Sequence, residues 1–434
     1  MKEDQQEQHQ ASNRHTVKSI LDNFRRNIFG IEYYFNKFGN LAQGADEDGL
    51  KQTSQYIIDS FKELGVDLDF SKEKTKDINI PLDKVADFFR KIKKQPKISA
   101  QNYEILSRSS FLMLNNYFEY LISDLLSYYY SKFQNSLNEK KFNIALKEIN
   151  EFDSLEDFTK SLITKEVESM IVELSFNDLL DHFHNTLGIN NEKDIVKWDT
   201  IIECRERRHL IVHNSSLVNK KYISRTKNPF NLKIGDTVHV DSEYFLNSCK
   251  EFFLAGLLLS YNSWGKWDKE EITQAIKEIM IDSFELLKQH EFELVARFTD
   301  YLQKIEPRSD EQEDFLMRAR VNRMIALKKL GNESTLTKEL KDLKVGTASP
   351  IFKLAYSILA GKHENIVELI RQSKAVDELD IHRYREWPIY EFVRSIPEIN
   401  SKIETELGTT GANMVLPKAK LDNMQSTDGI IKPL

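Results

Sequence analysis

The chain has 434 residues, which exceeds one ordinary hydrophobic core and predicts two or three domains. Hydrophobic residues make up 40% of the sequence, and it contains only 15 Gly and 9 Pro, a composition typical of a mostly helical protein. The formal net charge of -7 argues against a general nucleic-acid coat protein.

The sequence carries no signal for secretion or membrane insertion. Residues 1–15 are polar and lack the apolar stretch of a signal peptide, and we expect them to form a disordered tail. The most apolar run, Phe252 to Ser260, is too short to span a bilayer. Cys204 and Cys249 fit a reducing compartment, although a single bridge between them is compatible with the sequence. We expect a soluble, cytoplasmic protein without membrane contacts.

Helices in the first part of the chain are predicted from apolar spacing. The pattern predicts one helix over residues 17–31 and a second over 49–64. The charged segment 65–80 is interpreted as a loop, and a short helix is expected over 82–94.

A long apolar stripe follows, with steps of three and four residues that indicate one face of an amphipathic helix. Its members are Phe111, Leu114, Phe118, Leu121, Leu125 and Tyr128. We expect this face to pack in a core. Two further helices are expected over 154–174 and 176–187.

The next helix is expected from about Thr200 to Asn214. Thr200 and Glu203 have the spacing of a capping box, in which the hydroxyl and the carboxylate satisfy free amides of the first turn. A polar connection then leads to Thr237–Val240, interpreted as a short strand, and a further helix is expected over 243–261.

Past Trp267, three similar segments begin at Ser283, Met324 and Ala355. Each reads as a helix end, a turn and a new helix, at steps of roughly 30–40 residues, so the region resembles a degenerate tetratricopeptide array. An irregular helical bundle explains the pattern equally well. Residues 408–434 are interpreted as a disordered tail.

A basic island lies between Glu203 and Lys233. It contains eight basic residues and two acids, Glu203 and Glu206; the basic residues are Arg205, Arg207, Arg208, Lys220, Lys221, Arg225, Lys227 and Lys233. In an acidic chain such an island indicates a local anion site, and the alternative is a solvated helix face followed by a basic loop.

Within this island, Arg208, His209 and His213 match the R-[N/H/D]-x3-H signature of the HEPN superfamily. The surrounding residues 99–265 resemble the RiboL-PSP type of HEPN domain, including the helical stretch 106–126, Tyr222 and the run that ends at Tyr244. The resemblance implies a HEPN helical bundle with an N-terminal helical extension and the tetratricopeptide-like repeats after it.

The resemblance also implies an activity, a metal-independent endoribonuclease that cleaves RNA by 2′-hydroxyl transesterification and serves as a toxin or antiphage defence effector. Arg208, His209 and His213 would be catalytic, with His209 in an orienting role. The polar and basic neighbours expected to bind the substrate are Asn214, Arg205, Lys220 and Lys221. No cofactor and no metal are expected, and the C-terminal helices would receive a protein trigger or antitoxin.

The residue types suit this chemistry, because histidine titrates near neutral pH and a guanidinium fits phosphate oxygens. However, five residues on an ideal helix rotate by about 140°, so Arg208 and His213 do not share a face. HEPN domains dimerise with their motifs facing each other, and a homodimer would therefore complete the cleft.

Other interpretations remain. His209 and His213 have the i, i+4 spacing of a zinc-binding helix, but the catalytic Glu of such a helix is missing. Arg208 and His213 would otherwise only stabilise the helix end through its dipole. At the level of function, the alternatives are an inactive HEPN module for dimerisation or RNA binding, and an interaction scaffold built on the C-terminal repeats. The expected domain limits are 16–98, 99–265 and 266–407, with tails 1–15 and 408–434.

Overall fold

The computed structural model describes residues 16–63, 82–93, 101–138, 144, 146–149, 152–343, 345–346 and 348–408. Most of these residues are helical and none of them forms a strand, which confirms the all-α prediction. The strand expected at Thr237–Val240 is wrong, because Thr237 makes only an isolated bridge with Leu217. None of the helices described here combines the length and apolar character needed to cross a bilayer.

Contacts divide the chain into two units, the first ending at Ala275 and the second starting at Ile276. This division lies beyond the expected boundary at residue 265. The expected boundary at residue 98 falls inside the first unit, because the N-terminal helix packs against later helices of that unit. The expected tails and the loop 65–80 lie outside the described residues, except for Gly408.

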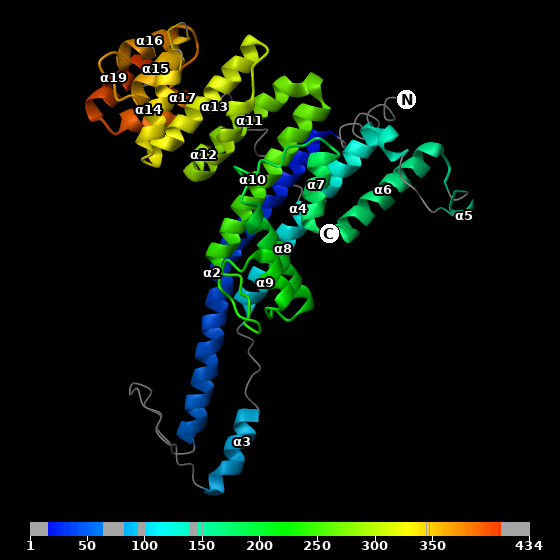
Figure 1. The fold of residues 1–434 in the computed structure, drawn as a ribbon. Coiled ribbons are helices and arrows are strands. Elements are labelled where there is room, and N and C mark those ends of the chain that lie inside the picture. Colours follow the sequence, from blue (N-terminus) through cyan, green and yellow to red (C-terminus); the bar gives the residue numbers. More distant parts are fainter. Residues whose placement is uncertain are drawn as a thin grey trace, which may run out of the picture. The chain divides into compact units, whose positions relative to one another are not determined.

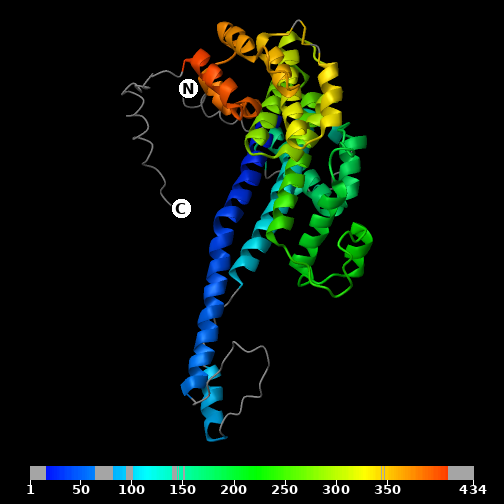
Figure 2. The same cartoon turned by 90° about the vertical axis from the view of Figure 1, so that its left-hand side faces the viewer.

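Three long helices form the body of the first unit: α2 (Val17–Glu63), α4 (Asn102–Lys132) and α10 (Ser242–Trp267). They run side by side in Figures 1 and 2. At Gly256 of α10, an added Cβ atom would lie 2.1 Å from the Phe24 ring and 2.9 Å from Leu121, so glycine permits this close approach. Arg25 of α2 also donates a hydrogen bond of 2.6 Å to the Tyr261 hydroxyl of α10.

Residues 17–63 form one continuous helix, whereas the sequence predicted two. The intervening residues gain a tertiary role, because the Asp46 carboxylate accepts hydrogen bonds of 2.8 and 2.9 Å from the backbone amides of Asn102 and Tyr103. Asp46 thereby caps α4, whose own N-cap residue, Gln101, provides no side-chain cap. The Tyr103 amide in particular lowers the pKa of Asp46.

The apolar stripe lies on α4 as predicted. Five of its six residues are buried, and the sixth, Tyr128, is partly buried and donates a hydrogen bond of 2.5 Å to Asp268. The remaining elements of the first unit are η1 (Leu82–Lys84), α3 (Val85–Lys93), η2 (Gln134–Leu137), α5 (Leu146–Ile149), α6 (Leu155–Glu173), α7 (Phe176–Asn185), α8 (Trp198–His213), α9 (Lys220–Thr226) and η3 (Lys269–Glu271).

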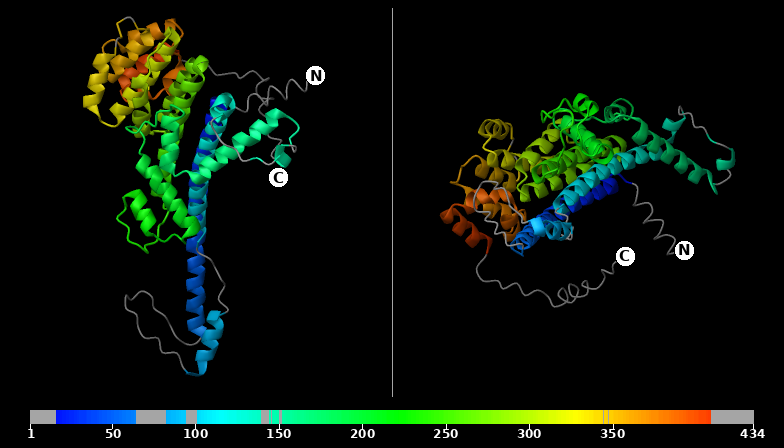
Figure 3. Two further views of the ribbon diagram at one scale, coloured as in Figure 1. Left: turned by 45° about the vertical axis from the view of Figure 1, so that its right-hand side comes forward. Right: turned by 90° about the horizontal axis from the view of Figure 1, so that it is seen from below.

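The second unit is a series of short helices, drawn mainly from yellow-green to red in Figure 3. Each of the three segments singled out in the sequence is a helix pair joined by a turn, and the turns contain His290, Gly331 and Gly361 with positive φ. Such a left-handed residue reverses the chain at a helix end. The elements are α11 (Ile272–Lys288), α12 (Phe292–Asp300), η4 (Tyr301–Lys304), α13 (Asp310–Lys329), α14 (Glu333–Asp342), α15 (Pro350–Leu359), α16 (Ile366–Ala375), α17 (Ile381–Glu386), η5 (Pro388–Tyr390), α18 (Glu391–Arg394) and α19 (Pro397–Leu407).

Candidate functional site

The helix α8 carries all three residues of the Arg-His-x3-His motif. It begins at Trp198 after Lys197, so the expected capping box is wrong: Thr200 already lies in the first turn and makes no cap. The helix ends at His213, where the Asn214 amide donates to Leu210 O (2.9 Å) and the Asn214 side chain donates to Leu217 O (2.6 Å). Asn214 is thus used to shape the turn after the helix.

Glu203 has a different role from the predicted cap. Its carboxylate is 1% exposed and accepts hydrogen bonds of 2.5 Å from the hydroxyls of Tyr222 and Tyr244 and of 2.8 Å from Arg207 Nε. Arg207 in turn donates to the carbonyl oxygen of His239 at 2.6 Å. This buried cluster (Glu203, Arg207, Tyr222 and Tyr244) fastens α8 to α9, to α10 and to the segment between them.

Burial raises the pKa of both tyrosines in the buried cluster above its ordinary value. The pKa of Arg207 is raised as well: burial disfavours its charge, but Tyr244 and Glu203 outweigh that effect. The sequence analysis placed Arg207 in the basic island. In the structure it is only 5% exposed, and its guanidinium carbon lies 4.1 Å from the centroid of the Tyr244 ring. It is therefore a structural cation.

Cys204 stands beside this cluster and is fully buried, as expected for a structural cysteine. Burial and the nearby Glu203 raise the pKa of its thiol to about 12, so it is protonated at neutral pH. Cys249 is also buried and free. The structure contains no bridge between these two cysteines.

On the other side of α8, the ring centroids of His209 and His213 lie 4.8 Å apart, and the angle between the ring planes is 49°. His209 is partly buried and His213 is exposed. Lys221, the second residue of α9, and Arg208 add positive charge, since both are among the causes that lower the pKa of His209. These four residues form what we call the cationic cluster (Arg208, His209, His213 and Lys221).

Partial burial is the largest cause of the lowered pKa of His209, followed by the charges of Lys221 and His213. Glu206 opposes the shift, but its carboxylate is already paired with Arg225 at 2.7 Å. Because the lowered value lies below the ordinary 6.5, His209 is neutral at physiological pH and can accept a proton.

Within the described residues, the side chains of Arg208, His213 and Lys221 make no hydrogen bond and no ion pair, and the Arg208 Nε atom is buried without a partner. A buried donor without an acceptor costs about 1–3 kcal/mol. Uncompensated positive groups at one helix end are an arrangement that an anion would stabilise.

Two other predicted substrate-binding residues, Arg205 and Lys220, are not grouped with the histidines, although the charge of Arg208 is among the causes that lower the pKa of Arg205. Arg205 pairs with Glu119 of α4 at 2.9 Å and its guanidinium lies 4.8 Å from the Phe176 ring centroid. Burial lowers its pKa. Only its Nη2 atom is paired, and its Nη1 atom is buried without a hydrogen-bond partner. Lys220 is exposed at the start of α9 and makes no contact with the histidines within the described residues.

A cavity of about 490 Å³ opens beside the buried cluster and is lined by Arg207, Phe230, His239 and Tyr244, among others. The sequence analysis predicted neither this cavity nor the role of Glu203. The spacing between Thr200 and Glu203 already accounted for Glu203 as part of a helix cap, so no tertiary role was considered. Among the described residues, no three His, Cys, Asp or Glu side chains are grouped in a way that could hold a metal ion.

Comparison of the chain with known proteins found no matching family model, no matching curated protein and no matching solved structure.

Proposed function

We propose that the protein is a HEPN-type, metal-independent endoribonuclease whose active site is the cationic cluster. The observation that carries the proposal is the pair of imidazoles 4.8 Å apart, with a guanidinium and an ammonium group close by and unpaired within the described residues. Phosphodiester cleavage needs a base, an acid and positive charge at the phosphorus, and this cluster offers all three.

In the proposed reaction His209, neutral because of its lowered pKa, accepts the proton of an RNA 2′-hydroxyl. The 2′-oxygen bonds to the adjacent phosphorus while the bond from phosphorus to the 5′-oxygen breaks. His213 supplies a proton to that leaving oxygen, and Arg208 and Lys221 stabilise the charge on the phosphorane. The products carry a 2′,3′-cyclic phosphate, or its hydrolysed form, and a 5′-hydroxyl.

The geometry supports catalysis over a purely structural role for the motif. Within the described residues, neither Arg208 nor His213 donates a hydrogen bond to the carbonyls at the end of α8, and Asn214 makes the contacts there. Glu203 and its partners fix the helix from its other side. A helix that is anchored on one side holds its remaining side chains in a preorganised arrangement.

We also propose that the protein is a homodimer, since a second copy would bring another Arg208 and His213 to the same cleft. A role as a toxin or antiphage defence effector in the cytoplasm fits this chemistry, and two free cysteines fit a reducing compartment.

The test is incubation of the purified protein with single-stranded RNA in the presence of EDTA. We expect cleavage to continue, to give cyclic-phosphate ends, and to stop at positions where the RNA carries a 2′-deoxyribose. Loss of activity with EDTA and its return with a divalent ion would refute the transesterification mechanism. Tight RNA binding without cleavage would instead favour an inactive RNA-binding module.

A further inference from the structure

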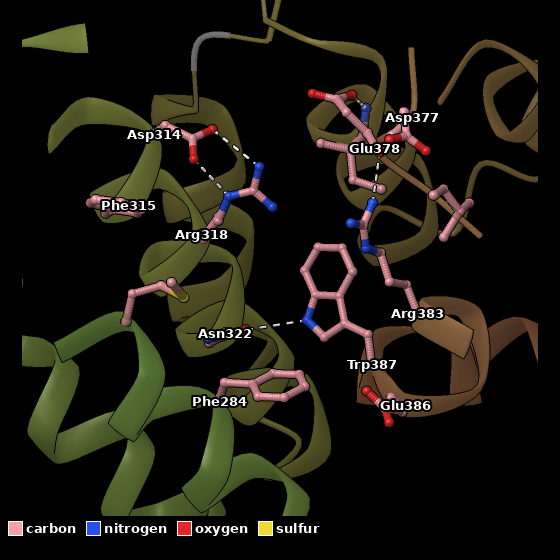
Figure 4. A pocket seen from close by; sticks show the side chains of 13 residues that line it. Phe284, Asp314, Phe315, Arg318, Asn322, Asp377, Glu378, Arg383, Glu386 and Trp387 are labelled. Atoms are coloured by element: carbon pink, nitrogen blue, oxygen red, sulfur yellow. Dashed lines mark hydrogen bonds and ion pairs between the residues drawn. The ribbon is translucent and has the colours of Figure 1, made fainter. Parts of the chain in front are cut away.

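The second unit contains a cavity of about 550 Å³, shown in Figure 4. It lies between α11, α13, α17 and the segment that joins α16 to α17. The volume is within the range of roughly 300–1,000 Å³ found for ligand sites, and Met280, Phe284, Phe315, Ile351 and Leu379 give it apolar walls.

Trp387 is fixed in the middle of this cavity (Figure 4). Its indole Nε1–H donates to Asn322 Oδ1 at 3.2 Å, and the amide nitrogen of Asn322 donates to Ser283 Oγ at 2.9 Å. Asn322 is only 2% exposed, so this chain of hydrogen bonds anchors the indole edge in the interior. Trp387 is partly exposed, and the Tyr390 ring lies nearly perpendicular to its indole with the centroids 5.7 Å apart, so the indole is held in a fixed position.

Some of the charged side chains around the indole have hydrogen-bond partners, and others have none within the described residues. Asp314 binds Arg318 with both oxygens, at 2.7 and 3.3 Å. Arg383 donates to the carbonyl oxygen of Asp377 at 2.7 Å. In contrast, the carboxylates of Asp377 and Glu386 are exposed and make no hydrogen bond or ion pair within the described residues.

Figure 4 places Asp377 above and Glu386 below the level of the Trp387 indole, with the Arg383 guanidinium, held by the Asp377 carbonyl oxygen, between Asp377 and the ring. An aromatic face flanked by unpaired carboxylates attracts a guanidinium or ammonium group through both cation–π and Coulomb interactions. The cavity therefore favours a ligand with positive groups on apolar stems.

The Nη1 atom of Arg318 provides a third kind of contact. Asp314 takes Nε and Nη2, and Nη1 makes no hydrogen bond within the described residues. It can donate to a carbonyl oxygen, a group that every peptide has and a simple polyamine lacks.

We propose that this cavity binds a short basic segment of a partner protein, with one Arg or Lys side chain stacked on Trp387 and paired with Asp377 or Glu386, and a main-chain carbonyl on Arg318. This inference does not depend on the ribonuclease activity proposed for the first unit.

The test uses the full-length protein and calorimetric titration with a capped pentapeptide, Gly-Arg-Phe-Arg-Gly. The matched ligand replaces both arginines by citrulline, which keeps the shape and removes the charge. We expect the citrulline peptide to bind about 2- to 30-fold more weakly, the span that corresponds to the loss of a cation–π contact. Equal affinity for the two peptides, or no binding of the arginine peptide, would overturn the proposal.

Protein variants make the test specific to the cavity. Asp377→Asn combined with Glu386→Gln removes both exposed carboxylates without touching the core, and asparagine tolerates the positive φ of 58° at position 377. This variant should lose affinity to a similar extent, while Glu364→Gln, an exposed acid outside the cavity, should not. Unchanged binding by the double variant would place the peptide elsewhere.

Trp387→Ala should weaken binding further, and Trp387→Phe should recover part of the loss, because phenylalanine keeps an aromatic face but cannot donate to Asn322. Helical content is checked by circular dichroism for each variant. Spermine serves as the competitor. If spermine binds as tightly as the arginine peptide, the cavity selects a polyamine and the peptide assignment is wrong.

Discussion

His209 and His213 place their imidazole rings 4.8 Å apart on the last turn of α8, with His209 partly buried and His213 exposed. The i, i+4 spacing puts both rings on one side of the helix. Because of this adjacency we propose a chemical role for His209, whereas the motif alone implied only an orienting role. In the proposed mechanism the neutral imidazole of His209 accepts one proton, and the exposed imidazole of His213 supplies the other.

Replacing either histidine by alanine should lower the rate of RNA cleavage by about 10²- to 10⁴-fold, the usual contribution of a general acid or base. The measurement is single-turnover cleavage of a labelled RNA. His184→Ala is the matched control, because His184 is exposed on α7 and touches neither ring within the described residues. Near-normal activity of both variants would remove the imidazole pair from the mechanism.

The acidic side of the pH–rate profile should report His209. Its pKa is lowered from the ordinary 6.5, so activity should fall at a more acidic pH than an ordinary imidazole would give. Lys221→Ala removes a cause of the lowering and should move this limb upward toward 6.5, while Lys220→Ala should leave it in place. NMR titration of the His209 ring gives the same test without turnover; an unmoved limb in Lys221→Ala would contradict this electrostatic account.

The same shift has a consequence for stability. The folded state binds fewer protons at His209 than the unfolded chain, so the contribution of this residue is complete above pH 6.5 and decreases as the pH falls below that value. The Lys221→Ala variant should lose less stability on acidification than the wild type. Denaturation curves measured across this pH range check the direction.

Glu203→Gln should destabilise the first unit, because it leaves Arg207 buried without its ion-pair partner. Breaking a buried pair costs about 3–5 kcal/mol. On the same helix, Glu206→Gln breaks a more exposed pair with Arg225 and should cost about 0–1 kcal/mol. Chemical denaturation measures both values, and equal costs would show that Glu203 is not the anchor of α8.

Mixing Arg208→Ala protein with His213→Ala protein should restore part of the cleavage that neither variant has alone, because the cleft shared by the two protomers would then contain one intact Arg208 and one intact His213. Recovered activity should rise with the fraction of mixed dimers, measured by native mass spectrometry. A monomeric wild-type enzyme with full activity would contradict the composite site.

The sequence predicted those elements that are decided by local periodicity. The stripe from Phe111 to Leu125 repeats at helical intervals, so its burial in a core could be predicted. The structure shows that α2 and α10 pack against this helix. The helix pairs of the second unit were also visible, since Gly331 and Gly361 mark the turns. Whether they form a tetratricopeptide array stays a prediction.

Features decided by tertiary contacts were missed. The stretch between the two expected N-terminal helices contains Gly39 and Gly44, each of which costs about 1 kcal/mol in a helix, yet α2 continues through both. Asp46 in that stretch gains its role only from Asn102 and Tyr103, 56 and 57 residues away. Likewise, Glu203 has the local spacing of a cap, and only the folded chain brings Tyr222 and Tyr244 to it.

The contact at Gly256 between α10 and α2 affects how the chain folds during its synthesis on the ribosome. Arg25 and its partner Tyr261 are 236 residues apart, so at roughly 5–20 residues per second the ribosome needs about 10–50 s to deliver α10 after α2. During that interval Phe24 can pack against Phe118 of α4, but the part of α2 that faces Phe253 and Gly256 of α10 stays uncovered. Newborn chains should therefore depend on chaperones that hold α2, and slower translation before residue 242 should increase aggregation.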